Sequence, residues 1–168
     1  MRLLSLITVT ACAAVMFGTV VHAQQPVAPP PPPEYGMPIS QANAMKAAAA
    51  AQAQAEKLGI NVVISIVAPS GDLLYLTKMD KAQYGSIAVS QAKARAAALY
   101  RRPSKVFEDV VAGGGAGITL MTLPGVIASA GGLPIMQNGK IVGAIGVSGA
   151  PRGVIDEEAS KAGVDAVK

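Results

Sequence analysis

The clearest alternation of apolar and polar positions in the chain lies within residues 131–151, GGLPIMQNGKIVGAIGVSGAP. Two apolar runs flank Asn138 and Gly139 there. A two-residue type I′ turn favours Asn-Gly because both of its central residues need a positive φ. The pattern therefore predicts an antiparallel β-hairpin whose turn sets the register of its two strands.

The second strand of this hairpin carries no charge from position 141 to 148, so both of its faces are expected to be covered. One face is Ile141, Gly143, Ile145 and Val147, and the other is Val142, Ala144, Gly146 and Ser148. The second face is small, which lets either a helix or a flat ligand approach the backbone closely. On the first strand, Pro134 is expected opposite Gly143. Its missing N–H indicates an edge strand, a bulge, or pairing that starts after it.

Periodicity and turn residues elsewhere predict four helices and three more strands. The helices are expected at 41–58 with Ser40 as N-cap, at 86–100, at 104–111, and from a cap near Asp156; the strands are expected at 61–68, 73–78 and 118–123. Positions 87, 90, 94 and 97 give the second helix a small face suited to the small face of the sheet. Because hairpins join the strands, this order predicts an α+β fold in which helices cover an antiparallel sheet.

Composition limits the chain to one domain with a core of small side chains. Of its 168 residues 51% are hydrophobic, only 4% are aromatic, and there is no Trp. The formal net charge of +4 is too small and too scattered to indicate nucleic-acid binding, and it is compatible with a small anionic ligand. Cys12 is the single cysteine, which excludes an internal disulfide and a cysteine-based metal cluster.

Residues 1–23 have the pattern of a secretory signal peptide, with Arg2, an apolar stretch, and a small-residue cleavage site before Gln24. The protein is therefore expected to be periplasmic or secreted. A lipoprotein-type site at Cys12 and an uncleaved anchor are the alternatives. Cleavage before Gln24 would also remove His22, the only histidine, and leave a mature chain without His or Cys.

Residues 24–38 are predicted to form an extended, Pro-rich linker, because five consecutive prolines occupy positions 29–33. Such a segment can act as a spacer that holds the following domain away from a membrane or a partner. It can also act as a proline motif that a partner protein recognises. The domain itself is expected to span residues 39–168.

Several short motifs in that domain together resemble the GlcG/HbpS family of haem-binding, haem-degrading-type proteins. They are KMDKA at 78–82, GSI at 85–87, RPS at 102–104, GGLPI at 131–135 and GAIGVSG at 143–149. The same domain forms the C-terminal part of PduO-type corrinoid adenosyltransferases. The resemblance implies a profilin-like fold, with a five-stranded antiparallel sheet and helices on both faces. It also implies assembly into homo-oligomers and, in several members, haem binding.

The resemblance also suggests which residues would contact a haem. Without a histidine in the mature chain, Tyr84 is the best-placed axial ligand for iron, with Tyr75, Tyr100 and Met79 as alternatives. Cations near the 86–100 helix could hold the haem propionates, or they could simply be a solvated helix face: Lys93, Arg95, Arg101, Arg102 and Lys105. The expected cofactor-binding residues are Met79, Asp80, Tyr84, Lys93, Arg101, Ser148 and Gly149.

The sequence is compatible with three functions. The first is a secreted protein that binds haem or another tetrapyrrole without catalysis, and for this reason no catalytic residue is assigned. The second is an accessory subunit that docks on a periplasmic redox enzyme through its Pro-rich linker. The third is an enzyme acting on haem or a small hydroxy acid, with acid–base chemistry by Asp80, Lys78, Asp156 or Tyr84.

Overall fold

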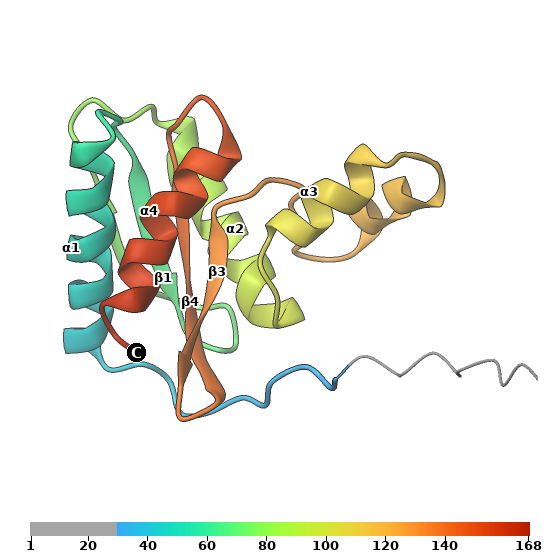
Figure 1. Ribbon diagram of the computed structural model, residues 1–168, viewed down its shortest axis with the longest axis horizontal. Coiled ribbons are helices and arrows are strands. Elements are labelled where there is room, and N and C mark those ends of the chain that lie inside the picture. Colours follow the sequence, from blue (N-terminus) through green and yellow to red (C-terminus); the bar gives the residue numbers. More distant parts are fainter. Residues whose placement is uncertain (1–29) are drawn as a thin grey trace, which may run out of the picture. The chain divides into compact units, whose positions relative to one another are not determined.

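Two hairpins build the sheet of this protein. The computed structural model describes residues 30–168, so the predicted signal peptide and the first part of the predicted linker lie outside the described residues. The strands are β1 (Val63–Val67), β2 (Leu73–Lys78), β3 (Gly132–Gln137) and β4 (Lys140–Ser148). They form one antiparallel sheet in the order β2-β1-β4-β3 (Figure 1).

The β3–β4 hairpin confirms the predicted turn and corrects the predicted register. Asn138 and Gly139 both have positive φ, at 50° and 75°. Pro134, however, lies opposite Ala144 rather than Gly143, because the register shifts between Ile135 and Met136. This β-bulge adds one residue to β4 and moves every later pair by one position. β3 is an edge strand, which is one of the three explanations offered for its proline.

The predicted fifth strand at 118–123 is wrong. These residues fall mainly in the 3₁₀ segment η1 (Gly115–Thr122), so the described sheet has four strands. Positive φ angles at Gly114 and Gly115 turn the chain, and η1 then packs against α3 (Lys105–Ala112) instead of the sheet. A short apolar run does not by itself distinguish a strand from a helical segment. The profilin-like fold stays a prediction.

Helices cover both faces of the sheet. α1 (Gln41–Lys57) and α4 (Gly153–Asp165) lie on one face and α2 (Gly85–Tyr100) lies on the other, whereas α3 packs against η1 beside the sheet. Ser40 is the N-cap of α1 as predicted, and its Oγ accepts a hydrogen bond from the Asn43 N–H at 3.3 Å. The expected cap near Asp156 is wrong, because α4 begins at Gly153 and Asp156 lies buried in its first turn.

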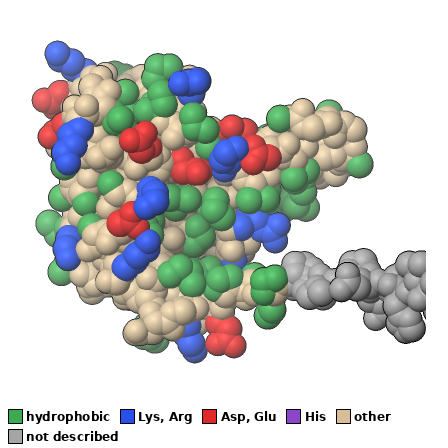
Figure 2. All heavy atoms as spheres, viewed as in Figure 1, with side chains coloured by type: hydrophobic (Ala, Val, Ile, Leu, Met, Phe, Trp, Pro, Cys, Tyr) green, Lys and Arg blue, Asp and Glu red, His purple; other side chains and the backbone are tan. Residues whose placement is uncertain are grey.

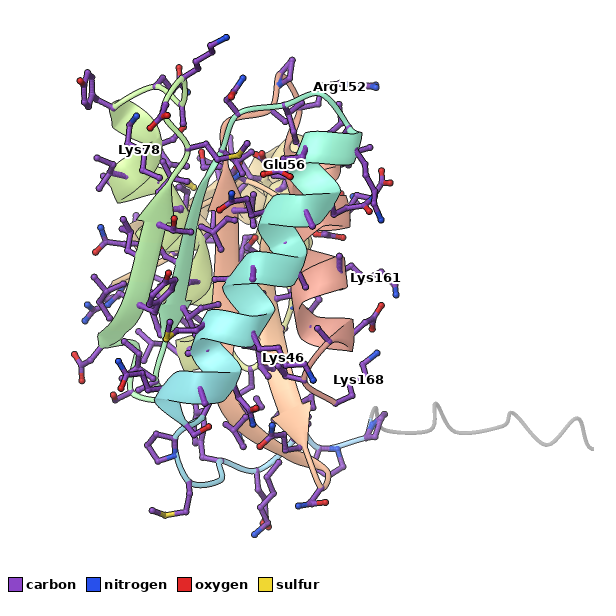
Figure 3. The ribbon with its side chains drawn as sticks, turned by 90° about the vertical axis from the view of Figure 1, so that its left-hand side faces the viewer. Lys46, Glu56, Lys78, Arg152, Lys161 and Lys168 are labelled. Atoms are coloured by element: carbon purple, nitrogen blue, oxygen red, sulfur yellow. The ribbon has the colours of Figure 1, made fainter. Side chains whose placement is uncertain are left out.

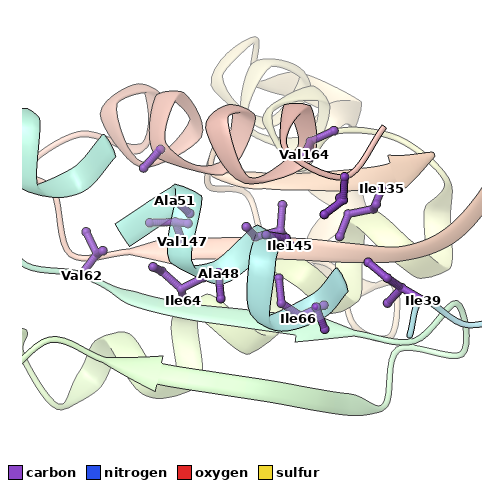
Figure 4. Close-up of a cluster of buried hydrophobic side chains, with 14 of the residues drawn as sticks. Ile39, Ala48, Ala51, Val62, Ile64, Ile66, Ile135, Ile145, Val147 and Val164 are labelled. Atoms are coloured by element: carbon purple, nitrogen blue, oxygen red, sulfur yellow. The ribbon is translucent and has the colours of Figure 1, made fainter. Parts of the chain in front are cut away.

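The larger core lies between the sheet and the pair α1 and α4. Ile64, Ile66, Ile145 and Val147 point toward this side and meet alanines of α1 (Figure 4). The side chains are small, and so the helices approach closely. A Cβ on Gly163 of α4, for example, would lie 2.8 Å from a carbonyl oxygen of α1. None of the helices within residues 30–168 is long and apolar enough to cross a membrane.

The other face of the sheet is covered by α2. A Cβ on Gly146 would lie 2.0 Å from the carbonyl oxygen of Ser90 and 2.5 Å from the backbone nitrogen of Ala94. The predicted small faces of sheet and helix therefore do pack together, and β4 needs glycine at this point. Of the two alternatives for the small face, a helix occupies it rather than a flat ligand.

The end of the predicted linker is attached to β4. Tyr35 forms a parallel bridge with Ile141, whose N–H donates to the carbonyl of Glu34 and whose carbonyl accepts from Gly36, each at 2.8 Å. The N–H of Ile39 donates to Val142. Because β1 pairs with β4 only from Ala144 onward, this segment continues the sheet where β1 stops. Residues 34–38 are thus part of the folded unit formed by residues 31–168.

Candidate functional site

Three of the expected site residues lie at the end of β2 and the start of α2. The Met79 sulfur accepts a hydrogen bond from the Val62 N–H at 3.4 Å. Lys78 Nζ donates to the carbonyls of Met79 and Asp80 and lies 5.1 Å from the centre of the Tyr84 ring. Lys78, Met79 and Asp80 also line a recess of about 450 Å³. The sequence motif therefore folds into one polar end of the domain.

The chemistry of this end does not suit an apolar ligand. Besides Met79 the recess is lined by polar and charged side chains: Gln52, Glu56, Asn61, Thr77, Lys78, Asp80 and Lys81. Glu56 and Lys78 lie at the same end of the molecule in Figure 3. Tyr84 stands beside this end with 83% of its surface exposed. A haem placed here would have almost no apolar surface against which to lose water.

Ser148 and Gly149 are accounted for by packing within the domain. Ser148 is 5% exposed, and its hydroxyl donates to the Ser86 hydroxyl at 3.2 Å. A Cβ on Gly149, whose φ is +152°, would lie 2.2 Å from the carbonyl oxygen of Asn61. The two residues join the end of β4 to the start of α2 and to the loop before β1.

Lys93 lies in the interior and not on a solvated helix face. Its side chain is 2% exposed, and Nζ donates to Asp156 Oδ2 at 2.8 Å and to the Val147 carbonyl at 3.1 Å. Asp156 also accepts from the Ala150 N–H at 2.9 Å. Burial raises the pKa of the Asp156 carboxyl, although Lys93 and Ala150 oppose the rise. The ion pair ties α2, β4 and α4 together.

Arg101 lies at the far end of α2 from Tyr84. The helix has 16 residues, which separates the two by about 25 Å at 1.5 Å per residue. Arg101 is the C-cap and adopts the left-handed conformation with φ 54°. Its guanidinium donates to the carbonyl of Pro33 at 3.4 Å and lies 5.6 Å from the centre of the Tyr35 ring. A single protomer therefore does not bring all the expected site residues together.

An apolar groove of about 340 Å³ begins beside Arg101 and runs across β3 to α4. Its apolar lining residues are Pro33, Pro103, Leu133, Pro134, Met136, Ile141 and Val164. Its charged lining residues are Arg101, Arg102, Lys161, Lys168 and Asp165. Figure 2 shows apolar atoms gathered on this face, with basic side chains on both sides of them. An apolar floor between cations is what an amphipathic anion requires.

The two ends of the groove differ in the charge they offer. Asp165 forms ion pairs with both Lys161 and Lys168, which lowers the pKa of its carboxyl, so the α4 end is partly neutralised. At the α2 end, the partners of Arg101 and Arg102 within residues 30–168 are the backbone carbonyls of Pro33 and Tyr100. Five donors per guanidinium leave several N–H groups for a ligand. Anionic groups are therefore better accommodated at the arginine end.

Sequence reasoning identified the arginines of this groove but missed its floor. The RPS and GGLPI motifs contain Pro103, Leu133 and Pro134, and so a signal was present in the resemblance. The remaining residues come from the segment before α1, from the β3–β4 hairpin, and from α4 and the residues after it, which only the fold brings together. Among residues 30–168 there is no group of three or more His, Cys, Asp or Glu side chains that could hold a metal ion.

Comparison with known proteins agrees with the resemblance found in the sequence. Residues 39–165 match the family described as "Haem degrading protein HbpS-like". Protein GlcG of Escherichia coli (strain K12) is 38% identical over 110 residues, which cover 66% of this chain and 81% of GlcG.

Two solved structures share the fold. A double mutant of Streptomyces reticuli HbpS superposes with a TM-score of 0.73 and 32% identity, over 87% of this chain and 99% of HbpS. A PduOC:heme complex superposes with a TM-score of 0.69 and 25% identity, over 77% of this chain and 95% of PduOC. The chain therefore belongs to the haem-degrading protein HbpS-like family.

Proposed function

We propose that this protein binds haem or a closely related tetrapyrrole in the groove between Arg101 and α4. The observation that carries the proposal is the combination of an apolar floor with four cationic side chains and one carboxylate. Membership of the HbpS-like family and the likeness to a PduOC:heme complex support the same class of ligand.

The groove suits the two chemical parts of a haem. The macrocycle is flat and apolar, and each Å² that it removes from water against Leu133, Pro134 or Val164 contributes about 25 cal/mol. The propionates are anionic and planar, which matches the fork of a guanidinium better than an ammonium. The propionates would therefore lie toward Arg101 and Arg102, with the macrocycle over the proline-lined floor.

The backbone of Arg101 supports a role for this residue in binding. Left-handed conformations are usually taken by glycine, and a non-glycine residue there costs of order 1–3 kcal/mol. The contacts of the Arg101 guanidinium with Pro33 and Tyr35 hold the side chain in place. Such pre-ordering reduces the entropy that is lost when a ligand binds.

Haemin titration of the protein lacking residues 1–23, followed in the Soret region, tests the proposal. The unmutated protein is expected to saturate at micromolar haemin. Arg101→Ala is expected to weaken binding by roughly 10- to 150-fold, because a hydrogen bond to a charged group contributes about 1.5–3 kcal/mol and each 1.4 kcal/mol is tenfold. Lys78→Ala, at the polar end, is the matched control and should bind normally. Unsaturable binding would contradict the proposal, as would equal weakening in both variants.

We also propose that binding takes place outside the cytoplasm. The support is the signal-like pattern of residues 1–23, which lie outside the described residues. Expression of the full chain in its own host, followed by fractionation and N-terminal sequencing, tests this. A mature N-terminus at Gln24 in the extracytoplasmic fraction is expected, and a full-length cytoplasmic protein would contradict it.

A further inference from the structure

We infer that the thioether sulfur of Met136 is the axial ligand that this chain offers to the iron of a haem bound in the groove. The inference rests on the proposed function and adds the residue that contacts the metal. Candidate ligands are side chains that can donate a lone pair to iron, and they are the tyrosines of the domain and the residues that line the groove.

The tyrosines are placed away from the groove or are otherwise engaged. The Tyr35 hydroxyl donates to the carbonyls of Ala98 and Leu99 at 3.0 and 2.9 Å, and the Tyr100 hydroxyl donates to Pro124 at 2.8 Å. Tyr75 packs against the core on β2, at the opposite edge of the sheet from β3. Tyr84 lies about 25 Å along α2 from the arginine end, at 1.5 Å per residue.

Among the described groove residues, Met136 alone carries an uncharged donor atom. Guanidinium and ammonium groups have no lone pair to donate to iron. Both oxygens of the Asp165 carboxylate are already engaged in ion pairs, one with Lys161 and one with Lys168. Thioether sulfur is an established haem ligand. Iron in this groove would therefore meet sulfur or no protein ligand at all.

The position of Met136 in β3 suits this role. Along β3, Ile135 is buried in the core while its neighbours Pro134 and Met136 are half-buried and line the groove. Met136 lies opposite the fully buried Ile141 and directly after the bulge, a feature that often re-aims a side chain near a functional site. Met136 is thus part of the groove floor and is partly accessible to a ligand there.

A thioether ligand has a measurable consequence for the iron. It carries no charge and is soft, so it favours the ferrous state and raises the reduction potential relative to a site without it. The absorption spectrum of the haem also reports ligation directly, because its bands respond to the identity of the axial ligand. These readouts do not require the protein to have an activity.

The test compares the same substitution at two methionines in haemin-loaded protein. Met136→Leu keeps the size and apolar character of the side chain, so the dissociation constant is expected to change by less than about tenfold. Its Soret and visible bands should shift because the iron–sulfur bond is lost, and its midpoint potential should fall. Met79→Leu, at the polar end of the domain, should leave both readouts unchanged. Met136→His should restore a protein-ligated spectrum, with the band positions of imidazole in place of thioether ligation, since imidazole is also an established haem ligand.

The outcomes separate the inference from the proposed function. If haemin does not bind the unmutated protein saturably, both fail. If it binds, and Met136→Leu has the unmutated spectrum and potential, the axial ligand is not Met136 while the proposed function stands. A spectral change in Tyr84→Phe or in Met79→Leu would also overturn the inference. A spectral change that Met136→Leu shows and Met79→Leu does not, together with imidazole-type bands in Met136→His, supports it.

Discussion

Removal of the buried Lys93 ammonium should destabilise the domain strongly. In Lys93→Met the aliphatic stem is nearly preserved, but Asp156 loses its counter-charge while its side chain stays 3% exposed. Breaking a buried ion pair by removing one partner costs about 3–5 kcal/mol. A domain of ordinary stability has about 5–15 kcal/mol in total, so the variant should still fold but should unfold at a much lower urea concentration.

The expected loss in free energy of unfolding depends on the contacts that remain in each variant. In Lys93→Met, Asp156 keeps only the hydrogen bond from Ala150, and the Val147 carbonyl loses the donor at 3.1 Å. In the double variant Lys93→Met/Asp156→Asn no charge is buried. Its expected cost is about 1–3 kcal/mol, the penalty for an unsatisfied buried polar group. The double variant should therefore be more stable than Lys93→Met, which is the signature of coupling.

The pH dependence of this pair gives a second, independent check. Burial raises the pKa of the folded Asp156 carboxyl above its ordinary value, with Lys93 opposing the rise. The folded state thus holds this proton more tightly than the unfolded chain. The stability that protonation of Asp156 gives to the folded state is fully present below the ordinary pKa of the carboxyl, and it is lost as the pH rises through the raised pKa of the folded state. Without Lys93 the rise is larger, so the deficit of Lys93→Met should shrink on acidification.

Urea unfolding of the unmutated, single and double variants at pH 7 and at about pH 4.5 measures all of these quantities. The reasoning is refuted if Lys93→Met loses less than about 1 kcal/mol at pH 7, well below the cost of a broken buried pair. It is also refuted if the double variant is no more stable than Lys93→Met, or if the deficit is the same at both pH values.

Three further predictions concern the packing and assembly of the domain. Gly146→Ala should lose about 3 kcal/mol or more in urea unfolding, because its Cβ would lie 2.0 Å from the Ser90 carbonyl oxygen. Gly85→Ala, with no atom within 4 Å of its Cβ, is the control and should stay within about 0.5 kcal/mol of the unmutated protein; equal losses would contradict the packing. Tyr35→Phe should lose about 1 kcal/mol and be cleaved faster near residues 31–38 in limited proteolysis, since its hydroxyl donates to α2; unchanged cleavage would mean that other contacts hold the segment. The homo-oligomer expected from the sequence should appear in sedimentation at micromolar concentration and dissociate in Ile118→Asp, because Ile118 is 57% exposed in η1; a monomeric unmutated protein would refute it.

The elements that sequence reasoning placed correctly are those with local causes. Asn138 and Gly139 determine a turn within two residues, and Ser40 caps α1 through a side chain three residues away from its donor. The register beyond Ile135 could not be predicted in this way, because a bulge depends on the packing of both strands. The strand predicted at 118–123 was wrong for a different reason: the apolar pattern of this segment fits a strand and a 3₁₀ segment equally well.

The site was harder to predict because proximity along the chain was taken as proximity in space. Tyr84 and Arg101 flank one helix, and the length of that helix places them at opposite ends of the domain. For Lys93 the sequence suggests a contact with a haem propionate or a solvated helix face, although this lysine follows Ser90, on the small face of the helix, by three positions. In a helix this spacing puts both residues on the same side, so its burial could have been inferred from the sequence. The groove could not be inferred in this way, because part of its lining comes from α4, which is distant in the sequence from the arginines.

Pro134 has a consequence for how the domain meets other chains. An open sheet edge invites another polypeptide to add a strand by backbone hydrogen bonding, which leads to domain swapping or aggregation. β3 is such an edge, and at Pro134 it has no N–H with which to recruit an incoming strand. The same residue lines the apolar groove. An apolar surface can thus lie open along this sheet edge, because the backbone at Pro134 offers an incoming strand no donor, whereas the proposed haem needs none.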